Sequence, residues 1–590
     1  MTAAGRVRPV SAARPRRTPG RLRSHLLRPV LTGLGAVAGA GLLVGALPWL
    51  SGDDPARTVL RAREVEREPD PAVLAALREQ LDLPADPVRG TLSWLGRAVT
   101  GDLGTSWVSG QPVGEVVPPA LGVSATLAGT AAAVAVVLAV LLALPVVRRA
   151  ADGRADGGGA AGVLAAALAA LPEFVLAVVG VAVVAVGWGL LPTSGFTGPE
   201  HLVLPVLALA LPAGGLLGRV LAGAVRETAG EAWVRSWRAA GVSRSAVQGA
   251  VARRALTVVV PQVLLLLVGL LGAGAVIEAV FDVPGLGRVA LAGALAQDLP
   301  VVQAAVALLV LLGLVAGGAG VLVHRALLGP AGSDGGLSPE LPPPVPRAGR
   351  WAAGLLAVLA LVVLAGVLRD PTAQDLGDRL AAPSWEHPLG ADALGRDVLA
   401  RFGAGALPSV GLALLISAVV LVTGVAAGLL GRGRAGLADV LNALPAVVVG
   451  IAVAAVAGPS LVGAAVAVSL VAWIPLAVHT RTLAAEVRAS GFHLAARTSG
   501  AGRGHLVRHH LLPAVLPPVG RHALLRVPHT ALALAGLSFL GLGAGAESPE
   551  WGRSLADGVG YLERAPWLVA VPAAGLVLLG VAAGLVRTGR

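Results

Sequence analysis

The chain lacks cysteine and lysine and contains few charged residues. All 46 residues counted as lysine or arginine are arginine, and charged residues make up 14% of the 590 residues. Without cysteine, the chain cannot form disulfides, thiolate metal sites or cysteine nucleophiles. A Walker A loop needs its lysine to reach the nucleotide phosphates, so no conventional P-loop can form. If ATP drives this protein, another polypeptide hydrolyses it.

The scarcity of charge accompanies a high content of apolar residues. Hydrophobic residues make up 55% of the chain and the mean hydropathy is +0.78, whereas soluble proteins carry about 25% charged residues. The net charge of +12 does not indicate nucleic acid, because the arginines cluster between apolar runs, where membrane topology places them. We therefore expect a polytopic protein in the lipid bilayer and no nucleic-acid partner.

Twelve apolar runs are long enough to cross about 30 Å of hydrocarbon. They predict an all-α membrane protein with about twelve transmembrane helices in two halves of six, at residues 29–328 and 351–590. The first set lies near 29–50, 121–147, 160–187, 202–222, 256–279 and 301–323. The second set lies near 351–368, 409–430, 437–457, 460–480, 514–536 and 566–586.

A proline-rich segment at residues 329–350 separates the two sets. Its centre reads Leu341-Pro-Pro-Pro-Val-Pro346. Proline has no amide hydrogen and blocks a continuing helix, so this segment is expected to be an exposed, semi-stiff linker. Because a half with six spans starts and ends on the same side of the membrane, a linker without a span is enough to join two halves.

The distribution of arginine predicts the orientation in the plasma membrane. The tail at residues 1–28 contains eight arginines and no acidic residue, which by the positive-inside rule places it in the cytoplasm. Counting spans from this tail places both termini and the linker in the cytoplasm. The same count makes residues 51–120 and 369–408 external, and makes the polar segments at 223–255 and 481–513 cytoplasmic.

The two polar segments resemble each other. The first reads Glu231-Ala-Trp-Val-Arg-Ser-Trp-Arg-Ala-Ala-Gly241 and the second reads Phe492-His-Leu-Ala-Ala-Arg-Thr-Ser-Gly500. Both resemble the EAA loop of ABC importer permeases, a helix-turn-helix that in this family docks on the ATPase subunit. A glycine between two short helices permits a turn with positive φ, which other residues adopt only at about 1 to 2 kcal/mol. Arginines would donate charge-assisted hydrogen bonds to the ATPase. The resemblance assigns coupling to Glu231, Arg235, Arg238, Gly241, Arg497, Gly500, His510 and Pro513.

Further strings resemble the dipeptide, oligopeptide and nickel class of these permeases. Residues 93–106 and 278–288 look like the "B" type permease, and residues 387–397 and 537–543 look like the "C" type. The resemblance implies a type I ABC importer-like fold with both permease subunits fused in one chain. It also implies two ABC ATPase subunits, or one double ATPase, on the cytoplasmic face and an extracytoplasmic substrate-binding protein on the other. No enzymatic site and no cofactor are then expected in this chain, because the partner subunits bind ATP.

Several residues in these strings are candidates for gating on the outer side or for contact with the binding protein. The short glycine motifs at 285–287 and 541–543 are wrongly placed for nucleotide loops, and we interpret them as turns or helix breaks. The outer candidates are Gly101, Asp102, Glu278, Pro284, Gly285, Gly287, Asp392, Arg396, Asp397, Gly541 and Gly543.

Five other positions have more than one interpretation. Trp237 replaces a small residue and Leu534 stands where the family often has glutamate, which indicates a changed partner surface or a degenerating copy. His505 and His509 are four residues apart and could share a metal, but a loop surface without metal is the favoured interpretation. Glu173, near the start of the third span, could belong to a proton relay, although at the end of a span we expect it to reach the interface.

Two other classes of function are compatible with parts of the sequence. An ion-coupled secondary transporter can also be built from two six-helix halves, but few carboxylates lie within the predicted spans. A membrane scaffold or sensor that transports nothing would leave the paired polar segments without a purpose. The small apolar residues of the spans do not distinguish a peptide from a nickel complex, an opine or a sugar as the substrate.

Overall fold

The computed structural model describes residues 41–50, 71–80, 86–150, 159–328, 348–430 and 445–588, together with residues 35, 38 and 39. The expectations for the tail at 1–28, and for nearly all of the proline-rich linker, lie outside these residues. Within the described part, regular structure is helical, and β pairing is limited to the isolated bridges Thr105–Pro112 and Ala391–Asp397. The all-α prediction is confirmed.

The first half runs from α2 to α13. Its helices are α2 (Leu47–Leu50), α4 (Pro71–Gln80), α5 (Pro87–Val99), α6 (Val113–Ala150), α7 (Gly159–Leu168), α8 (Glu173–Gly180), the π-helix η1 (Val181–Gly187), α9 (Glu200–Gly230), α10 (Ala232–Ala239), α11 (Arg244–Val280), α12 (Leu286–Leu295) and α13 (Leu299–Leu328).

The second half runs from α14 to α24. Its helices are α14 (Ala348–Val367), the 3₁₀ turn η3 (Leu376–Asp378), α15 (Val398–Ala406), the π-helix η4 (Leu407–Gly411), α16 (Leu412–Leu430), α18 (Ala446–Ala457), α19 (Leu461–Ala489), α20 (Gly491–Thr498), α21 (Arg503–Leu506), the π-helix η5 (Val507–Leu511), α22 (Leu512–Phe539), α23 (Trp551–Val559) and α24 (Trp567–Thr588).

Where the chain is described, most helices agree with the apolar runs. Parts of the runs at 29–50 and 437–457 lie outside the described residues, and α22, over the run at 514–536, is not among the apolar spans. Among the described residues, eight helices are long and apolar enough to cross a membrane, and α7 with α8 and η1 would make a ninth. The run at 160–187 was expected to be one span, but it bends by 88° between α7 and α8. Pro172 precedes α8, and its ring prevents the helix from continuing. Pro445 precedes the short apolar helix α18 in the same way.

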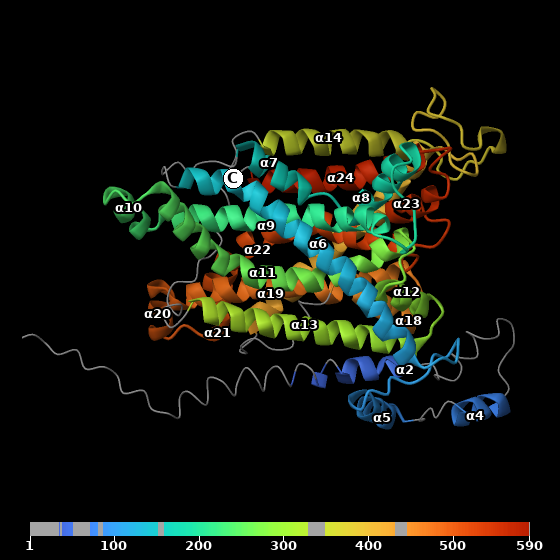
Figure 1. Ribbon diagram of the computed structural model, residues 1–590, viewed down its shortest axis with the longest axis horizontal. Helices are drawn as coiled ribbons and strands as arrows, with labels where there is room; N and C mark the ends of the chain where they lie inside the picture. Colours follow the sequence, from blue (N-terminus) through green and yellow to red (C-terminus); the bar gives the residue numbers. More distant parts are fainter. Residues whose placement is uncertain are drawn as a thin grey trace, which may run out of the picture.

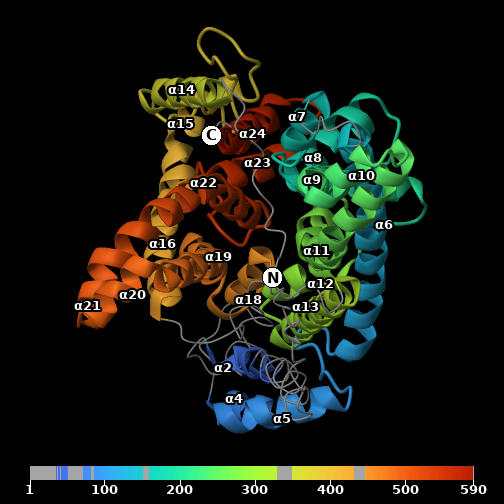
Figure 2. The ribbon, with the colours of Figure 1, turned by 90° about the vertical axis from the view of Figure 1, so that its left-hand side faces the viewer.

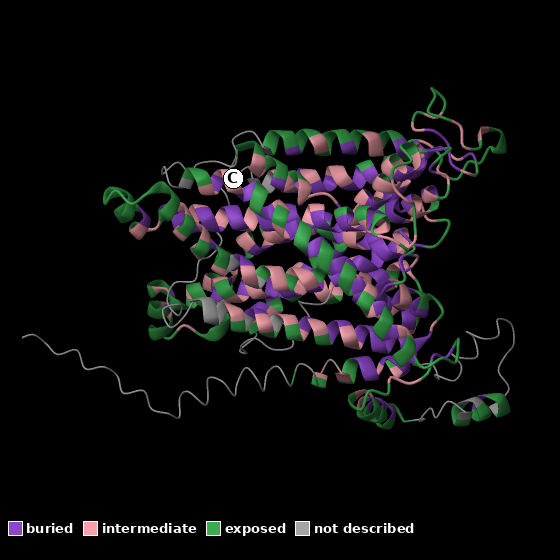
Figure 3. Ribbon diagram, in the orientation of Figure 1, coloured by how far each residue is buried: buried purple, intermediate pink, exposed green. Residues whose placement is uncertain are grey.

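The long helices lie side by side, and the connecting elements gather at the two ends of the bundle (Figure 1). Helices α10 and α20 lie at one end, where the chain also finishes, whereas α5, α12 and α23 lie at the other. The two polar segments therefore share an end, and the segments expected to be external share the opposite end. Buried residues are densest toward α12 and α23, while α10 and α20 are largely exposed (Figure 3).

The two halves pack against each other through equivalent elements. Viewed from the end that carries α10 and α20, they lie on opposite sides of the molecule (Figure 2). Helix α18 of the second half contacts α11, α12 and α13, and α24 contacts α7 and α8 of the first half. The rings of Phe174 and Phe539 lie 6.0 Å apart across this interface. Glu173, the first residue of α8, is half-buried beside this contact.

Candidate functional site

The two polar segments form the same helix-turn-helix. Glu231 and Ser490 are extended residues that precede the eight-residue helices α10 and α20. Gly241 and Gly500 follow these helices with φ angles of +75° and +87°. Nothing lies within 4 Å of where a Cβ would stand on either glycine. A side chain at these positions would therefore be penalised by the backbone conformation alone, at about 1 to 2 kcal/mol.

The first segment is held by an ion pair and an apolar contact. The Glu231 carboxylate lies 3.5 Å from Nε of Arg254 on α11 and accepts a hydrogen bond of 2.6 Å from Nε1 of Trp233. Val234 is fully buried in a cluster that also contains Val251. These contacts fix α10 against the start of α11.

The second segment is held by histidine rings instead. His493 and His510 occupy the places of Val234 and Val251, counted from the glycine of each turn. The ring of His510 lies edge-on to His493 at 6.0 Å and stacks on Phe492 at 5.7 Å. His493 is 7% exposed. Ser490 and Pro513 stand where the first segment has Glu231 and Arg254, so that ion pair has no counterpart here.

The arginines of the two segments differ in what they contact. Nη1 of Arg235 donates a 2.8 Å hydrogen bond to the carbonyl oxygen of Gly230 within its own segment. Arg238 and Arg497 are exposed, as is Pro513 near the start of α22. Trp237 is 40% exposed, and its ring meets Trp233 edge-on at 5.2 Å. Arg238, Trp237 and Arg497 are therefore among the exposed side chains of these segments.

The histidine pair of the second segment does not complete a metal site. The rings of His505 and His509 stack with their centroids 4.3 Å apart. Among the described residues, no group of three or more histidine, aspartate or glutamate side chains could hold a metal ion.

A buried glutamate organises the opposite end of the first half. Glu278 is fully buried at the end of α11 and accepts hydrogen bonds from the Ser124 hydroxyl and, at 3.0 Å, from the Arg288 amide. The Leu286 amide donates to Ser124 Oγ at 2.8 Å. The glutamate and the serine together satisfy amide groups at the start of α12 and tie this helix to α6 and α11.

The second half builds the same network from different positions. Ser409 in η4 donates to Oε1 of Glu550 at 3.1 Å, and the Arg553 amide donates to its Oε2 at 2.9 Å. The Trp551 amide donates to Ser409 Oγ at 2.9 Å. Glu550 is the residue before α23 and is fully buried. The sequence analysis did not single out Ser124, Ser409 or Glu550. The signal that could have identified Glu550 is an isolated glutamate directly before a short helix, where its side chain can cap the helix.

Two different structural constraints favour glycine at the outer positions, namely a positive φ angle and close packing. Gly101 and Gly541 have φ angles of +88° and +79° and lie in open turns. Gly285 has an extended backbone, and a Cβ there would lie 2.3 Å from the Glu278 carboxyl carbon. Gly287 is pressed against the backbone of α11, with 2.3 Å from its notional Cβ to Ala275 Cα. The 285–287 motif stands at a helix break: Gly285 directly precedes α12 and Gly287 lies within it, and packing explains why both residues are glycine.

The remaining outer candidates of the first half lie on the surface of the molecule. Asp102 is exposed and accepts a 2.9 Å hydrogen bond from the Gly104 amide, which shapes its own loop. Pro284 is exposed before α12. In the second half, Gly543 packs on Ser538, with 2.4 Å between its notional Cβ and the hydroxyl oxygen.

Each half also clamps an outer hairpin onto the start of its last helix. In the first half, the buried carboxylate of Asp298 accepts hydrogen bonds from the Ser106 hydroxyl and, at 3.0 Å, from the Trp107 amide. In the second half, Nε1 of Trp567 donates to the carbonyl oxygen of Ala391 at 3.1 Å. Because α13 and α24 begin beside these contacts, a movement of either helix would be transmitted to the outer surface.

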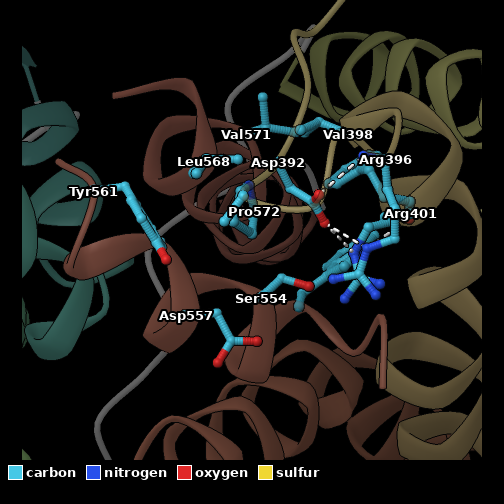
Figure 4. A pocket seen from close by; sticks show the side chains of 14 residues that line it. Asp392, Arg396, Val398, Arg401, Ser554, Asp557, Tyr561, Leu568, Val571 and Pro572 are labelled. Atoms are coloured by element: carbon cyan, nitrogen blue, oxygen red, sulfur yellow. Dashed lines mark hydrogen bonds and ion pairs between the residues drawn. The ribbon is translucent and has the colours of Figure 1, made fainter. Parts of the chain in front are cut away.

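The aspartates of the second hairpin are held by internal partners. Asp392 accepts a 2.7 Å hydrogen bond from Nε of Arg396 and lies 3.5 Å from Nε of Arg401. Figure 4 shows Asp392 between these two arginines, facing Ser554 and Asp557 across a cavity of about 80 Å³. Asp397 caps α15 by accepting from the Leu399 amide at 2.8 Å, and it also pairs with Arg369. The sequence analysis did not single out Arg401, which is buried in α15.

Comparison with known proteins agrees with this two-fold construction. The sequence pattern of the family described as binding-protein-dependent transport system inner membrane component matches residues 159–328 and again residues 421–588. One match lies in each half, so the module that was expected twice from the paired polar segments is present twice.

Individual relatives are similar to about two-fifths of the chain. The nickel transport system permease protein NikC of Escherichia coli (strain K12) is 35% identical over 252 residues, which is 40% of this chain and 91% of NikC. The dipeptide transport system permease protein DppC of Alkalihalophilus pseudofirmus is 34% identical over 220 residues, 36% of this chain and 72% of that protein. The di/tripeptide permease DppC of Pseudomonas aeruginosa is 32% identical over 260 residues, 41% and 86% of the two chains.

These similarities decide between the classes of function that the sequence left open. A secondary transporter or a scaffold does not account for two copies of this module. The chain therefore belongs to the family of binding-protein-dependent transport system inner membrane components, the membrane-spanning permeases of ABC importers.

Proposed function

We propose that this chain is the complete transmembrane part of an ABC importer, with both permease subunits fused. Helices α10 and α20, each followed by its glycine turn, would each dock on one ATPase domain in the cytoplasm. The observation that carries the proposal is that both helix-turn-helix segments lie at the same end of the bundle (Figure 1). Two separate ATPase subunits or one double ATPase would fit this arrangement.

The proposed cycle uses the chain as a mechanical element. ATP binding closes the ATPase pair and draws the two docked segments together. The halves then tilt against each other at the interface formed by α18 with α11 to α13 and by α24 with α7 and α8. Access to the space between the halves alternates from one end to the other. The chain supplies no ATPase site and binds no cofactor in this scheme.

The outer end is proposed to receive an extracytoplasmic substrate-binding protein. The hairpin at 102–112 is largely exposed there, and the hairpin at 387–397 exposes Pro388 and Leu394. They contact the first turns of α13 and α24. Through these contacts, docking of the binding protein would shift the transmembrane helices α13 and α24. The relatives carry dipeptide, di/tripeptide or nickel in their names, and we propose a peptide or a related small solute such as a nickel complex or an opine as the substrate.

Cysteine labelling tests the sidedness on which this function rests. Because the chain has no cysteine, single replacements of Ser245, Ser499, Ser93 and Ser384 give unique sites. In oriented membranes, a membrane-impermeant maleimide is expected to label Ser245→Cys and Ser499→Cys from the cytoplasmic side only. It should label Ser93→Cys and Ser384→Cys from the other side only. Labelling of Ser245→Cys and Ser93→Cys from the same side would overturn the arrangement.

A further inference from the structure

Helix α22 differs from its counterpart in the first half. The stretch Gln262–Val280 of α11 is one of the eight apolar spans, but α22 is not, although it has 28 residues. The difference comes from four basic residues on α22, namely Arg521, His522, Arg526 and His529. At the same distances from the glycine of the turn, α11 has Gln262, Val263, Leu267 and Leu270.

Two of these basic residues lie at a depth where lipid contact is unfavourable. Arg526 and His529 precede the end of α22, at Phe539, by thirteen and ten residues. With a rise of about 1.5 Å per residue, they lie roughly 20 and 15 Å from the outer end of the helix. This is within a hydrocarbon layer of about 30 Å. Ionisable residues at such depth face the interior of the bundle or a water-filled cavity.

Helix α22 has a buried side and an exposed side. Val519, Ala523 and Val527 are buried on the side that packs within the second half. Arg521, Leu524 and His529 are exposed on the rest of the helix. In Figure 2, α22 and α19 lie on the side of their half that faces the first half, and α16 lies behind them. Under the proposed function, this exposed side of α22 lines the path between the halves.

The group of basic side chains extends from α22 to α19. The rings of His522 and of His479 on α19 lie 5.2 Å apart. Arg526 is half-buried, and no carboxylate among the described residues lies within ion-pair distance of it. Helix α19, which packs against α22, adds one arginine and one carboxylate, Arg481 and Glu486. Positive charge exceeds negative charge in this part of the bundle.

We propose that α22 and His479 form a basic wall of the translocation path that selects solutes bearing carboxylate groups and a net negative charge. The basic wall consists of His479, Arg521, His522, Arg526 and His529. It rests on the proposed function, because it names the class of substrate that passes between the halves. Guanidinium groups in a water-filled path attract anions and disfavour cations, and imidazole N–H groups beside them can donate hydrogen bonds to carboxylates. An acidic peptide and an anionic metal chelate share this chemistry.

A direct test measures the electrostatic potential beside the wall without a substrate. Leu524 on α22 and Leu265 on α11 are equivalent exposed positions, with 68% and 43% exposure. Each is replaced by cysteine in the otherwise cysteine-free full chain, and the protein is placed in nanodiscs so that both faces meet water. The rates of reaction with an anionic and a cationic methanethiosulfonate are then compared. The ratio of anionic to cationic rates should be about tenfold higher at Leu524→Cys than at Leu265→Cys.

Charge removal makes this test specific. Adding Arg521→Gln and Arg526→Gln should bring the ratio at Leu524→Cys down to that at Leu265→Cys, whereas Leu267→Gln beside Leu265→Cys should change nothing. Equal ratios at the two cysteines would overturn the proposal. A failure of both reagents to react at Leu524→Cys would also overturn it, because the side chain would then face lipid or protein.

An uptake assay links the wall to the substrate. Proteoliposomes with the partner ATPase and binding protein receive Ala-Glu-Ala, Ala-Gln-Ala, Ala-Lys-Ala or nickel citrate. Arg526→Gln should reduce uptake of Ala-Glu-Ala or of nickel citrate by about tenfold while uptake of Ala-Gln-Ala changes little. The affected probe tells whether the anion is a peptide or a chelate. Because the binding protein is the same in both assays, the change reports the permease.

Failure of this inference differs from failure of the proposed function. If Arg526→Gln still transports the four probes, and their uptake rates keep the same order as in the unchanged protein, the basic wall is overturned. The importer assignment would remain in place. The assignment itself fails only if the labelling of the two ends or the dependence on a partner ATPase contradicts it.

Discussion

The two halves perform the same structural tasks with different residues. In the first half, Glu278 on α11 satisfies the start of α12, whereas in the second half Glu550 in the loop before α23 does so. The helix-turn-helix segment of the first half is held by the Glu231–Arg254 pair, and that of the second half by His493 and His510. Each half thus keeps the geometry of the turn and of the helix start but stabilises it with different side chains. The role of a residue in one half therefore follows from its own contacts and not from its counterpart in the other half.

The glycines of the coupling segments should give the largest effect on transport. Gly500→Val places a branched side chain at φ +87°, at a local penalty of about 1 to 2 kcal/mol. This should misplace α20 and α21 and abolish both ATPase association and uptake, while the mutant still accumulates in the membrane. Pull-down of the ATPase and uptake at matched membrane levels measure this.

Gly241→Val is the matched variant in the first half. We expect Gly500→Val to be at least as damaging as Gly241→Val. Normal uptake by both variants would show that the turns do not govern coupling.

Loss of a buried glutamate should give the largest effect on stability. Glu278→Ala leaves the Ser124 hydroxyl and the Arg288 amide without this acceptor, at about 1 to 3 kcal/mol for each buried group. Glu278→Ala and Glu550→Ala should both lower the thermal unfolding midpoint in detergent, and by similar amounts, because the two hydrogen-bond networks are the same. The conservative variants Glu278→Gln and Glu550→Gln retain an acceptor and should lose less. Unequal effects of the two alanine variants would break the equivalence of the halves.

A smaller effect is expected from Glu231→Gln. Its partner Arg254 is partly exposed, with 38% of its side chain accessible, and such ion pairs contribute about 0 to 1 kcal/mol. The variant should keep most of its transport and show a modest loss of ATPase affinity. Because the second segment has no such pair, Ser490→Ala is the control and should have almost no effect. A complete loss of transport in Glu231→Gln would show that this glutamate contacts the ATPase itself.

The smallest effect is expected from His493→Val. This change installs the residue that the first segment uses at the same place, where Val234 is fully buried. The Nδ1 atom of His493 is buried with no hydrogen-bond partner among the described residues, so an apolar replacement should leave stability unchanged or slightly raised. Hydrogen exchange of α20 measures this. Faster exchange with loss of ATPase binding would show that the imidazole itself is required.

The sequence predicted the architecture well because its signals are local. Apolar runs, arginine clusters and a glycine between two short helices depend on neighbours along the chain, and they placed the spans and both turns. The bend at Pro172 was missed because the apolar run at 160–187 continues through it. Glu173 begins α8 at that bend.

The networks of the outer end were less accessible from the sequence. Ser124 and Glu278 are 154 positions apart, and Ser409 and Glu550 are 141 apart. Nothing in either neighbourhood shows that these side chains meet. Gly285 was identified as important, but its reason, space for the Glu278 carboxylate, is a tertiary contact. Residues that act through long-range packing could therefore be found only in the folded chain.

The central claim is that this chain converts the movement of separate ATPase domains into transport. The most direct measurement is ATP hydrolysis and substrate uptake in proteoliposomes that contain the purified chain alone, and then the chain with its partner ATPase and the binding protein. The chain alone should hydrolyse no ATP, and addition of both partners should produce hydrolysis that rises with substrate and accompanies uptake. ATP hydrolysis by the purified chain alone, or uptake without any ATPase, would contradict the account.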